Sequence, residues 1–253
     1  MDSKSNGVIL WEGTSSLSDV AIVVIAVGLK GSSNRKTGSM LQTYILLQDI
    51  APVEAVKTGA DAAICGDCVH RGDGFKARTC YVNVGQGPRS VWECYKRGGY
   101  PHVSSAADIR AIGEGRKVRL GTYGDPKAAP AKIWQALIQK SVLHTGYTHQ
   151  WKSARGQVWQ SLVMASADTL GDKIAAQAKG FRTFRVNTDG QKSAGEVICP
   201  ASAEAGKVLQ CATCGACNGT RTERKGSITI RAHGSQVSEA NLVALDSRII
   251  ARA

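Results

Sequence analysis

The chain has 253 residues, of which 43% are hydrophobic and 21% charged, so it can bury a core and differs from a disordered chain. No run reaches the ~18 apolar residues that a membrane span needs. Lys and Arg number 32 against 20 Asp and Glu, a net charge of +12. The basic residues are dispersed, with one dense run at 221–225. Because neutralised phosphates release counterions, this charge predicts a polyanionic partner, most simply double-stranded DNA; a basic small-molecule enzyme is the alternative.

Short β-branched runs that end in Gly- or Ser-rich turns predict strands. Between the later strands, apolar residues at helical spacing predict helices. In chain order, the predicted elements are strands at 8–11, 21–27, 43–47 and 118–123, a helix at 131–141, strands at 145–149 and 162–167, a helix at 169–179, and strands at 181–186 and 227–232.

Strands that alternate with amphipathic helices indicate parallel βαβ units and an α/β fold. We expect a (β/α)8 TIM-type barrel, either complete or distorted and incomplete, with a C-terminal Cys-rich metal-binding lobe. An open, doubly wound sheet is the alternative. The expected domains are a barrel body at 1–190, with a Cys-rich insertion at 62–100, and a metal-binding segment with the final strand at 191–253.

The eight cysteines form two groups of four, separated by a long stretch that contains none. The segment before residue 20 carries one Lys and three acids, unlike a signal peptide, so we expect a reducing cytoplasm and metal-bound thiolates instead of disulfides. The second group has the spacing Cys-x11-Cys-x2-Cys-x2-Cys, which suits Zn²⁺ or a [4Fe–4S] cluster. Its members are Cys199, Cys211, Cys214 and Cys217, with His233 as a substitute ligand.

The first group has the spacing Cys-x2-Cys-x11-Cys-x13-Cys, and it is also predicted to bind metal. Its members are Cys65, Cys68, Cys80 and Cys94, and His70 lies beside them. A structural zinc ion that only staples a long loop is the alternative for either group, and we expect it to hold for at least one of them.

Polar residues follow several predicted strands, where the functional residues of parallel barrels lie. Asp125 and Asp168 are the first candidates, although each also fits a helix N-cap. His149 is either a functional or a satisfied half-buried histidine. The turn at 34–38 is either a phosphate site or a solvated loop. The other polar residues at strand ends are Glu12, Tyr147 and Arg182.

Several motifs together resemble a known family. They are Cys65-Gly66-Asp67-Cys68, Thr79-Cys80-Tyr81, Gly98-Gly99-Tyr100-Pro101 and the segments 118–126, 146–151, 164–169 and 182–186. The chain resembles the phage 7-deazaguanine DNA transglycosylases, relatives of the tRNA-guanine transglycosylases. This resemblance implies a TIM barrel, catalytic aspartates and a C-terminal zinc site of three Cys and one His. Cys211, Cys214, Cys217 and His233 are similar in kind, but the tighter first spacing of the family is absent and Cys199 is a rival ligand.

Radical-SAM-like barrels of phages are a competing resemblance. Their cluster needs Cys-x3-Cys-x2-Cys on one loop, and the Cys-x2-Cys-x11-Cys spacing of this chain departs from it.

The function implied by the first resemblance is exchange of guanine in DNA for a 7-deazaguanine base. Asp125 and Asp168 would handle the sugar cation and the protons, with Glu12 as the substitute for either carboxylate. His149 and Tyr147 would orient the extruded base. The flanking phosphate would be held by Asn34, Arg35 and Lys36. Arg182 is a further substrate-binding candidate. An iron–sulfur enzyme and a non-catalytic, zinc-stapled nucleic-acid-binding protein are the alternatives.

Overall fold

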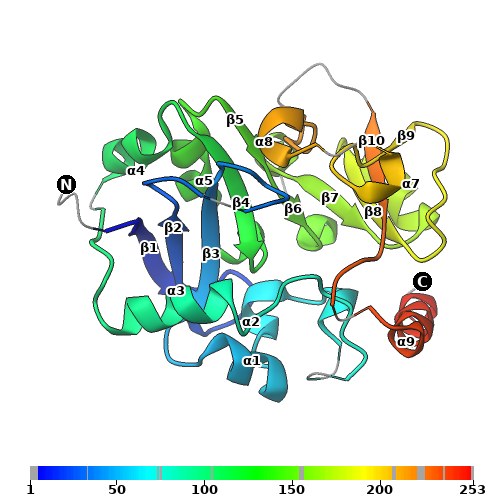
Figure 1. The fold of residues 1–253 in the computed structure, drawn as a ribbon, viewed down its shortest axis with the longest axis horizontal. Coiled ribbons are helices and arrows are strands. Elements are labelled where there is room, and N and C mark those ends of the chain that lie inside the picture. Colours follow the sequence, from blue (N-terminus) through cyan, green and yellow to red (C-terminus); the bar gives the residue numbers. More distant parts are fainter. Residues whose placement is uncertain are drawn as a thin grey trace.

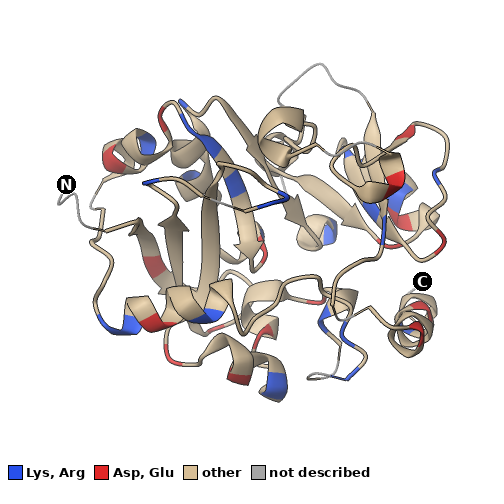
Figure 2. Cartoon of the chain, viewed as in Figure 1, with Lys and Arg blue, Asp and Glu red and all other residues tan. Residues whose placement is uncertain are grey.

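The computed structural model describes residues 5–32, 34–72, 74, 76–103, 105–153, 157–206, 209–220, 226–235 and 237–251. Two five-stranded sheets stand side by side, with helices around them (Figure 1). The basic run at 221–225 lies outside the described residues. In the described part, Lys and Arg are interspersed with Asp and Glu over both halves of the molecule (Figure 2).

The first sheet has the order β1-β2-β3-β4-β5. Its strands are β1 (Gly7–Thr14), β2 (Ala21–Val27), β3 (Leu41–Leu47), β4 (Lys117–Tyr123) and β5 (Leu143–Thr145). The first three strands pair antiparallel, whereas β3, β4 and β5 are parallel. A parallel neighbour needs a crossover of about a dozen residues, so the short turn at 15–20 forces β2 to run against β1.

The second sheet has the order β6-β7-β8-β10-β9, and all its pairings are parallel. Its strands are β6 (Tyr147–Thr148), β7 (Met164–Ala167), β8 (Thr183–Asn187), β9 (Glu196–Ile198) and β10 (Ser227–Arg231). β10 pairs with β8 on one side and with β9 on the other. The domain boundary expected at residue 190 therefore falls between strands of one sheet.

Helices surround both sheets, and α1 and α3 both contact β3 while α4 packs on α5. None of the described helices is both long and apolar enough to span a bilayer. The helices are α1 (Pro52–Thr58), α2 (Ala62–Cys65), α3 (Gly87–Lys96), α4 (Ala106–Gly113), α5 (Ala131–Ile138), α6 (Val158–Leu162), α7 (Leu170–Ala178), α8 (Cys211–Cys214) and α9 (Glu239–Ile250). Short 3₁₀ helices are η1 (Val69–Arg71), η2 (Pro126–Ala128), η3 (Gln150–Ser153) and η4 (Ala203–Ala205).

Gly146 carries the chain from the first sheet to the second, since it is the only residue between β5 and β6. A Cβ atom at this position would lie 2.9 Å from Val163 Cγ1 and 3.0 Å from Leu120 Cβ, closer than packing allows. Its N–H donates to the Cys217 carbonyl at 3.0 Å, and its carbonyl accepts from the Met164 N–H at 3.0 Å. The junction of the sheets is therefore tied to the second cysteine group.

The predicted α/β class is confirmed, and so are the parallel strands of its second half. The predicted closed barrel is not seen, because no strand pairing in the described residues joins β9 to β1 or β5 to β6. The first three strands are antiparallel, contrary to the expected βαβ units. The short strands β5 and β9 were not predicted, because three residues carry too little periodic signal.

A buried ion pair joins Glu196, the first residue of β9, to Arg185 of β8. Arg185 Nε and Nη2 donate to the two Glu196 oxygens at 2.8 and 2.7 Å, and the Ser193 N–H donates to the same carboxylate. Burial by itself raises the pKa of Glu196, but the Arg185 bonds outweigh it and hold this pKa below its ordinary value.

We expect Glu196→Gln to lower the free energy of unfolding by about 3–5 kcal/mol at pH 7, because it leaves a buried guanidinium unpaired. The lowered pKa means that the carboxylate stabilises the fold above its ordinary pKa of about 4.3, and the difference from the parent should shrink below that pH. Urea unfolding at several pH values measures both effects. The control is Glu54→Gln, which removes an exposed 3.9 Å pair with Lys57 and should change stability by under about 1 kcal/mol.

Candidate metal centre

A cavity of about 200 Å³ lies between the two sheets and receives side chains from both. Alternate residues of each strand point the same way, so whole faces of β4, β8 and β10 line it. Seven of the eight cysteines also line this cavity, from both sequence groups. The predicted separate Cys-rich lobe is therefore not seen. The lining residues from these three strands include Arg119, Gly121, Tyr123, Phe184, Val186, Ile228 and Ile230.

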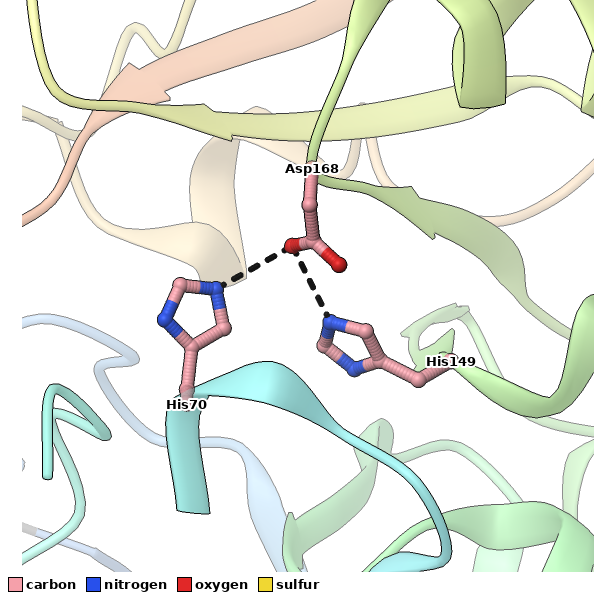
Figure 3. Close-up of side chains that lie close together, drawn as sticks. All are labelled: His70, His149 and Asp168. Carbon is pink, nitrogen blue, oxygen red and sulfur yellow. Dashed lines mark hydrogen bonds and ion pairs between the residues drawn. The ribbon is translucent and has the colours of Figure 1, made fainter. Parts of the chain in front are cut away.

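His70, His149 and Asp168 form the one group of three metal-ligand side chains found in the described residues, with donor atoms all within 4.8 Å of one another (Figure 3). Asp168 Oδ1 lies 3.3 Å from His70 Nε2 and 3.4 Å from His149 Nε2. Ligands at about 2.1 Å from a shared ion stand about 3.0–3.4 Å apart in octahedral or tetrahedral geometry. The spacing of these atoms fits a divalent cation.

Two of the three residues come from neighbouring parallel strands. His149 directly follows β6 and Asp168 directly follows β7, so both emerge at the same edge of the second sheet. Thr169, not Asp168, caps α7, accepting a bond from the Asp172 N–H at 2.8 Å. The carboxylate of Asp168 is thus left to the imidazoles.

His70 reaches this edge from η1, in the loop that carries the first cysteine group. The N–H groups of Thr79 and Cys80 both donate to the His70 carbonyl, at 3.2 and 3.0 Å. This return of the chain needs Gly72, whose φ is +74° and whose added Cβ would lie 2.5 Å from the Lys76 carbonyl oxygen. These bonds fix the position of the His70 backbone, and its side chain lies beside Asp168.

The ring of His70 is oriented as a metal ligand requires. A metal ion on Nε2 needs the ring proton on Nδ1, and Thr79 Oγ1 lies 2.9 Å from Nδ1, placed to accept it. Nε2 itself is buried and makes no hydrogen bond, although the Asp168 oxygen is near. A buried ring nitrogen without a hydrogen bond is costly, and a bound cation would satisfy it.

The electrostatics of the group follow from its burial. Burial by itself lowers the pKa of His149, but Cys68 and Asp168 outweigh it and hold this pKa well above its usual value. Burial would likewise raise the pKa of Asp168, but His149 and His70 hold it well below the usual range. Cys68 Sγ lies 3.8 Å from His149 Nε2 but outside the group of three. The site therefore pairs the Asp168 carboxylate with a proton on His149. A metal ion that binds there would displace this proton.

The other two predicted catalytic carboxylates are engaged elsewhere. Asp125 lines the cavity, but its oxygens accept bonds from the Lys127 N–H, the Thr148 hydroxyl and the His149 N–H at 2.7–2.9 Å. It caps η2 and ties β6 to it, which is the alternative that the sequence left open. Glu12 is not among the cavity residues; it accepts a 2.6 Å bond from the Tyr95 hydroxyl.

In the turn at 34–38, backbone N–H groups that were expected to hold a phosphate bind a side chain of the turn itself. Asn34 Oδ1 accepts from the N–H groups of Lys36 and Thr37 at 3.0 and 2.9 Å. Arg35 is exposed, whereas Lys36 lines the cavity. The turn is thus a wall of the cavity with its own bonds satisfied, and Lys36 is the member of it that faces inward.

The remaining predicted substrate residues divide in the same way. Tyr147 lines the cavity, with its ring centroid 4.5 Å from that of Phe184. Arg182 is buried outside the lining, where its guanidinium donates to the carbonyls of Gly219 and Gly226. It ties two backbone segments together.

Two predicted metal ligands have other partners, although one of them, His233, lines the cavity with the cysteines. Cys94 lies on α3 outside the cavity, where burial and this thiol raise the pKa of Tyr100. His233 is 2.5 Å from Lys36 Nζ, through Nε2, and its ring stacks on Tyr81. Burial, with the Lys36 charge, lowers the pKa of His233, which suits a neutral ring that accepts from the lysine.

Arg119 is the functional candidate that sequence reasoning missed. It is 6% exposed on β4, donates to the Tyr81 hydroxyl, and lies over the Tyr147 ring at 5.5 Å. No carboxylate in the described residues forms an ion pair with it. Only its inward position on a predicted strand could have marked it. A buried guanidinium without a counter-ion points to an anion in the cavity.

Comparison with protein-family models, curated proteins and solved structures finds no match for this chain.

We expect the parent protein to bind one Mn²⁺ per chain at this group, since Mn²⁺ prefers nitrogen and oxygen ligands over the nearby thiols. Asp168→Asn should weaken binding by more than the ~10- to 100-fold that losing a partner of a ligand costs. Titration followed by the electron paramagnetic resonance signal of free Mn²⁺ measures this. Glu12→Gln is the control and should bind like the parent. Equal affinity in Asp168→Asn and the parent would contradict the assignment.

Thr79→Val should weaken Mn²⁺ binding by about 10- to 100-fold, because His70 loses the acceptor that fixes its ring. Thr79→Ser keeps the hydroxyl and should restore affinity in the same titration. If the valine and serine variants bind equally, Thr79 does not orient the ligand.

Proposed function

We propose that this chain is a metal-dependent enzyme acting on an anionic substrate, with one divalent metal ion on His70, His149 and Asp168. The convergence of these three donor atoms within 4.8 Å carries the proposal. Three protein ligands are typical of catalytic sites, which keep a coordination position open, whereas structural zinc sites have four. Such an ion, when bound, supplies a Lewis acid and lowers the pKa of its bound water.

The residues of the cavity would bind and orient the substrate. His70 and His149 line the same cavity as Arg119, so an anionic group held by the guanidinium lies in the space that the metal site borders. Apolar side chains of β8 and β10 make up much of the wall and exclude water, which strengthens the attraction between the guanidinium and an anion. Asp125 acts as a positioning residue, because it accepts from the N–H of His149.

Base exchange on DNA, the function that the resemblance implies, calls for two carboxylates free to act on one sugar. The bonds of Asp125 and the place of Glu12 favour metal-dependent chemistry over such a pair. Duplex DNA and a 7-deazaguanine base stay predictions from net charge and resemblance. Both therefore belong among the substrates to be tested.

The test is to incubate Mn²⁺-loaded protein with a cell metabolite extract and, separately, with duplex DNA, and to follow both by mass spectrometry. We expect a change in a phosphate- or carboxylate-bearing compound that chelation abolishes and Asp168→Asn lacks. Arg119→Gln should lower kcat/KM by about 10- to 100-fold, the loss of one charged hydrogen bond. Lys57→Gln, at an exposed position of α1, is the control. Turnover that persists in Asp168→Asn would overturn the proposal.

A further inference from the structure

We infer that Cys199, Cys211, Cys214 and Cys217 hold a [4Fe–4S] cluster and not the zinc ion that the resemblance implies. This second centre goes beyond the proposed function and does not depend on it. The inference is carried by the spacing of the cysteines, the separation of their sulfur atoms and the charges beside them.

The spacing is that of an iron–sulfur loop. Three cysteines follow one another as Cys-x2-Cys-x2-Cys at 211–217, and Pro200 follows the fourth ligand, Cys199. The bacterial ferredoxin run, Cys-x2-Cys-x2-Cys-x3-Cys-Pro, contains the same triple. Its Cys-Pro cysteine ligates the other cluster in two-cluster ferredoxins, so the likeness rests on the triple. Zinc ligands more often come as two separate pairs.

No three of the four sulfur atoms, all in described residues, are close enough to share a single metal ion. With Zn–S bonds of about 2.3 Å, four thiolates in a tetrahedron stand about 3.8 Å apart. In the described residues, no three of these thiols lie within 4.8 Å of one another. All four nevertheless line the same cavity. A cluster that occupies the centre holds its thiolates farther apart than a single ion does.

The histidine of the implied zinc site does not join them. His233 Nε2 is occupied by Lys36 Nζ at 2.5 Å, and its Nδ1 is 2.9 Å from the Arg231 carbonyl. The donor set is therefore four sulfurs, which suits a [4Fe–4S] cluster.

The backbone holds the four cysteines in place through three separate segments. The Cys211 N–H donates to the Lys36 carbonyl at 3.0 Å, and the Cys199 N–H donates to the Thr229 carbonyl at 2.8 Å. The Cys217 carbonyl accepts from Gly146 at the junction of the sheets. Gly215, at φ +59°, lets the chain turn between Cys214 and Cys217.

Two cations of the cavity wall face this group. The Lys36 charge acts on Cys199 and Cys211, and the Arg119 charge acts on Cys211 and Cys217. Arg71 and Arg78, the other cations of the wall, lie instead within 4.0 Å of Asp61. Four thiolates bring more negative charge than an oxidised cluster core neutralises, and Lys36, which the proposed substrate site does not use, offsets part of the remainder.

The first experiment is anaerobic reconstitution of the full chain with ferric iron, sulfide and excess dithiothreitol, which supplies the two electrons that leave two ferric and two ferrous ions in the oxidised core. We expect about four iron and four sulfide per chain and the Mössbauer spectrum of a [4Fe–4S] cluster. Cys214→Ser and Cys211→Ser should each lose most of the iron. Cys94→Ser and Asp168→Asn should keep it, which separates this centre from the metal site of the proposed function.

Three outcomes would overturn the inference. The first is zinc without iron in protein purified anaerobically from iron-supplied cells. The second is parent-level iron and sulfide in both Cys211→Ser and Cys214→Ser. The third is loss of the cluster in Cys80→Ser with retention in Cys214→Ser, which would place it on the first cysteine group.

A second experiment uses no cysteine variant. Lys36→Gln should lower the midpoint potential of the cluster, because a nearby positive charge favours the added electron. Lys57→Gln is the matched control and should leave the potential unchanged. An identical potential in Lys36→Gln and the parent would show that the cluster lies away from Lys36, contrary to the inference.

Discussion

The position of one buried carboxylate organises the candidate metal centre. The side chain of Asp168 is 11% exposed, and the imidazoles of His70 and His149 stand at 3.3 and 3.4 Å from its Oδ1 atom. A carboxylate so far from water needs compensating charge or a metal ion. The loop before residue 80 brings His70 to it, and the end of β6 brings His149.

The cavity next to Asp168 gathers groups that are individually expensive to bury. The cations Lys36 and Arg119 share its wall with seven thiols, which become costly to bury when they are deprotonated to bind a metal, and with the apolar side chains of β8 and β10. Such a mixture is stable only where opposite charges offset one another or a metal binds. Thiolates and cations on the same wall are complementary in this sense. A cluster on the second cysteine group and a divalent ion on His70, His149 and Asp168 would each supply part of the compensation.

The connection between the sheets explains how two distant cysteine groups come to face one space. The chain steps directly from β5 to β6 at Gly146, a position where any Cβ would meet Leu120 and Val163. The N–H of the same residue donates to the carbonyl of Cys217, so the second cysteine group is bonded to the connection between the sheets. The first group enters from the loop after α2, and the parallel strands β6 and β7 end between the two.

Local pattern in the sequence determined the α/β class, most strands, the grouping of the cysteines and two of the three converging residues. Asp168 was predicted as a catalytic carboxylate and His149 as a substrate-binding residue, not as metal ligands, because functional residues of parallel barrels lie at strand ends, a rule that needs only strand positions. Tertiary structure decided the rest. His70 joins them through a loop whose path depends on Gly72. The packing of β4 buries Arg119, and none of the described carboxylates forms an ion pair with it. Hydrogen bonds to residues that are mostly far away in the sequence occupy the polar atoms of Asp125, Glu12, Arg182 and His233, and Asp125 also caps a helix. Which polar group a side chain bonds depends on the packing of distant segments, and periodicity along one segment carries no record of that packing.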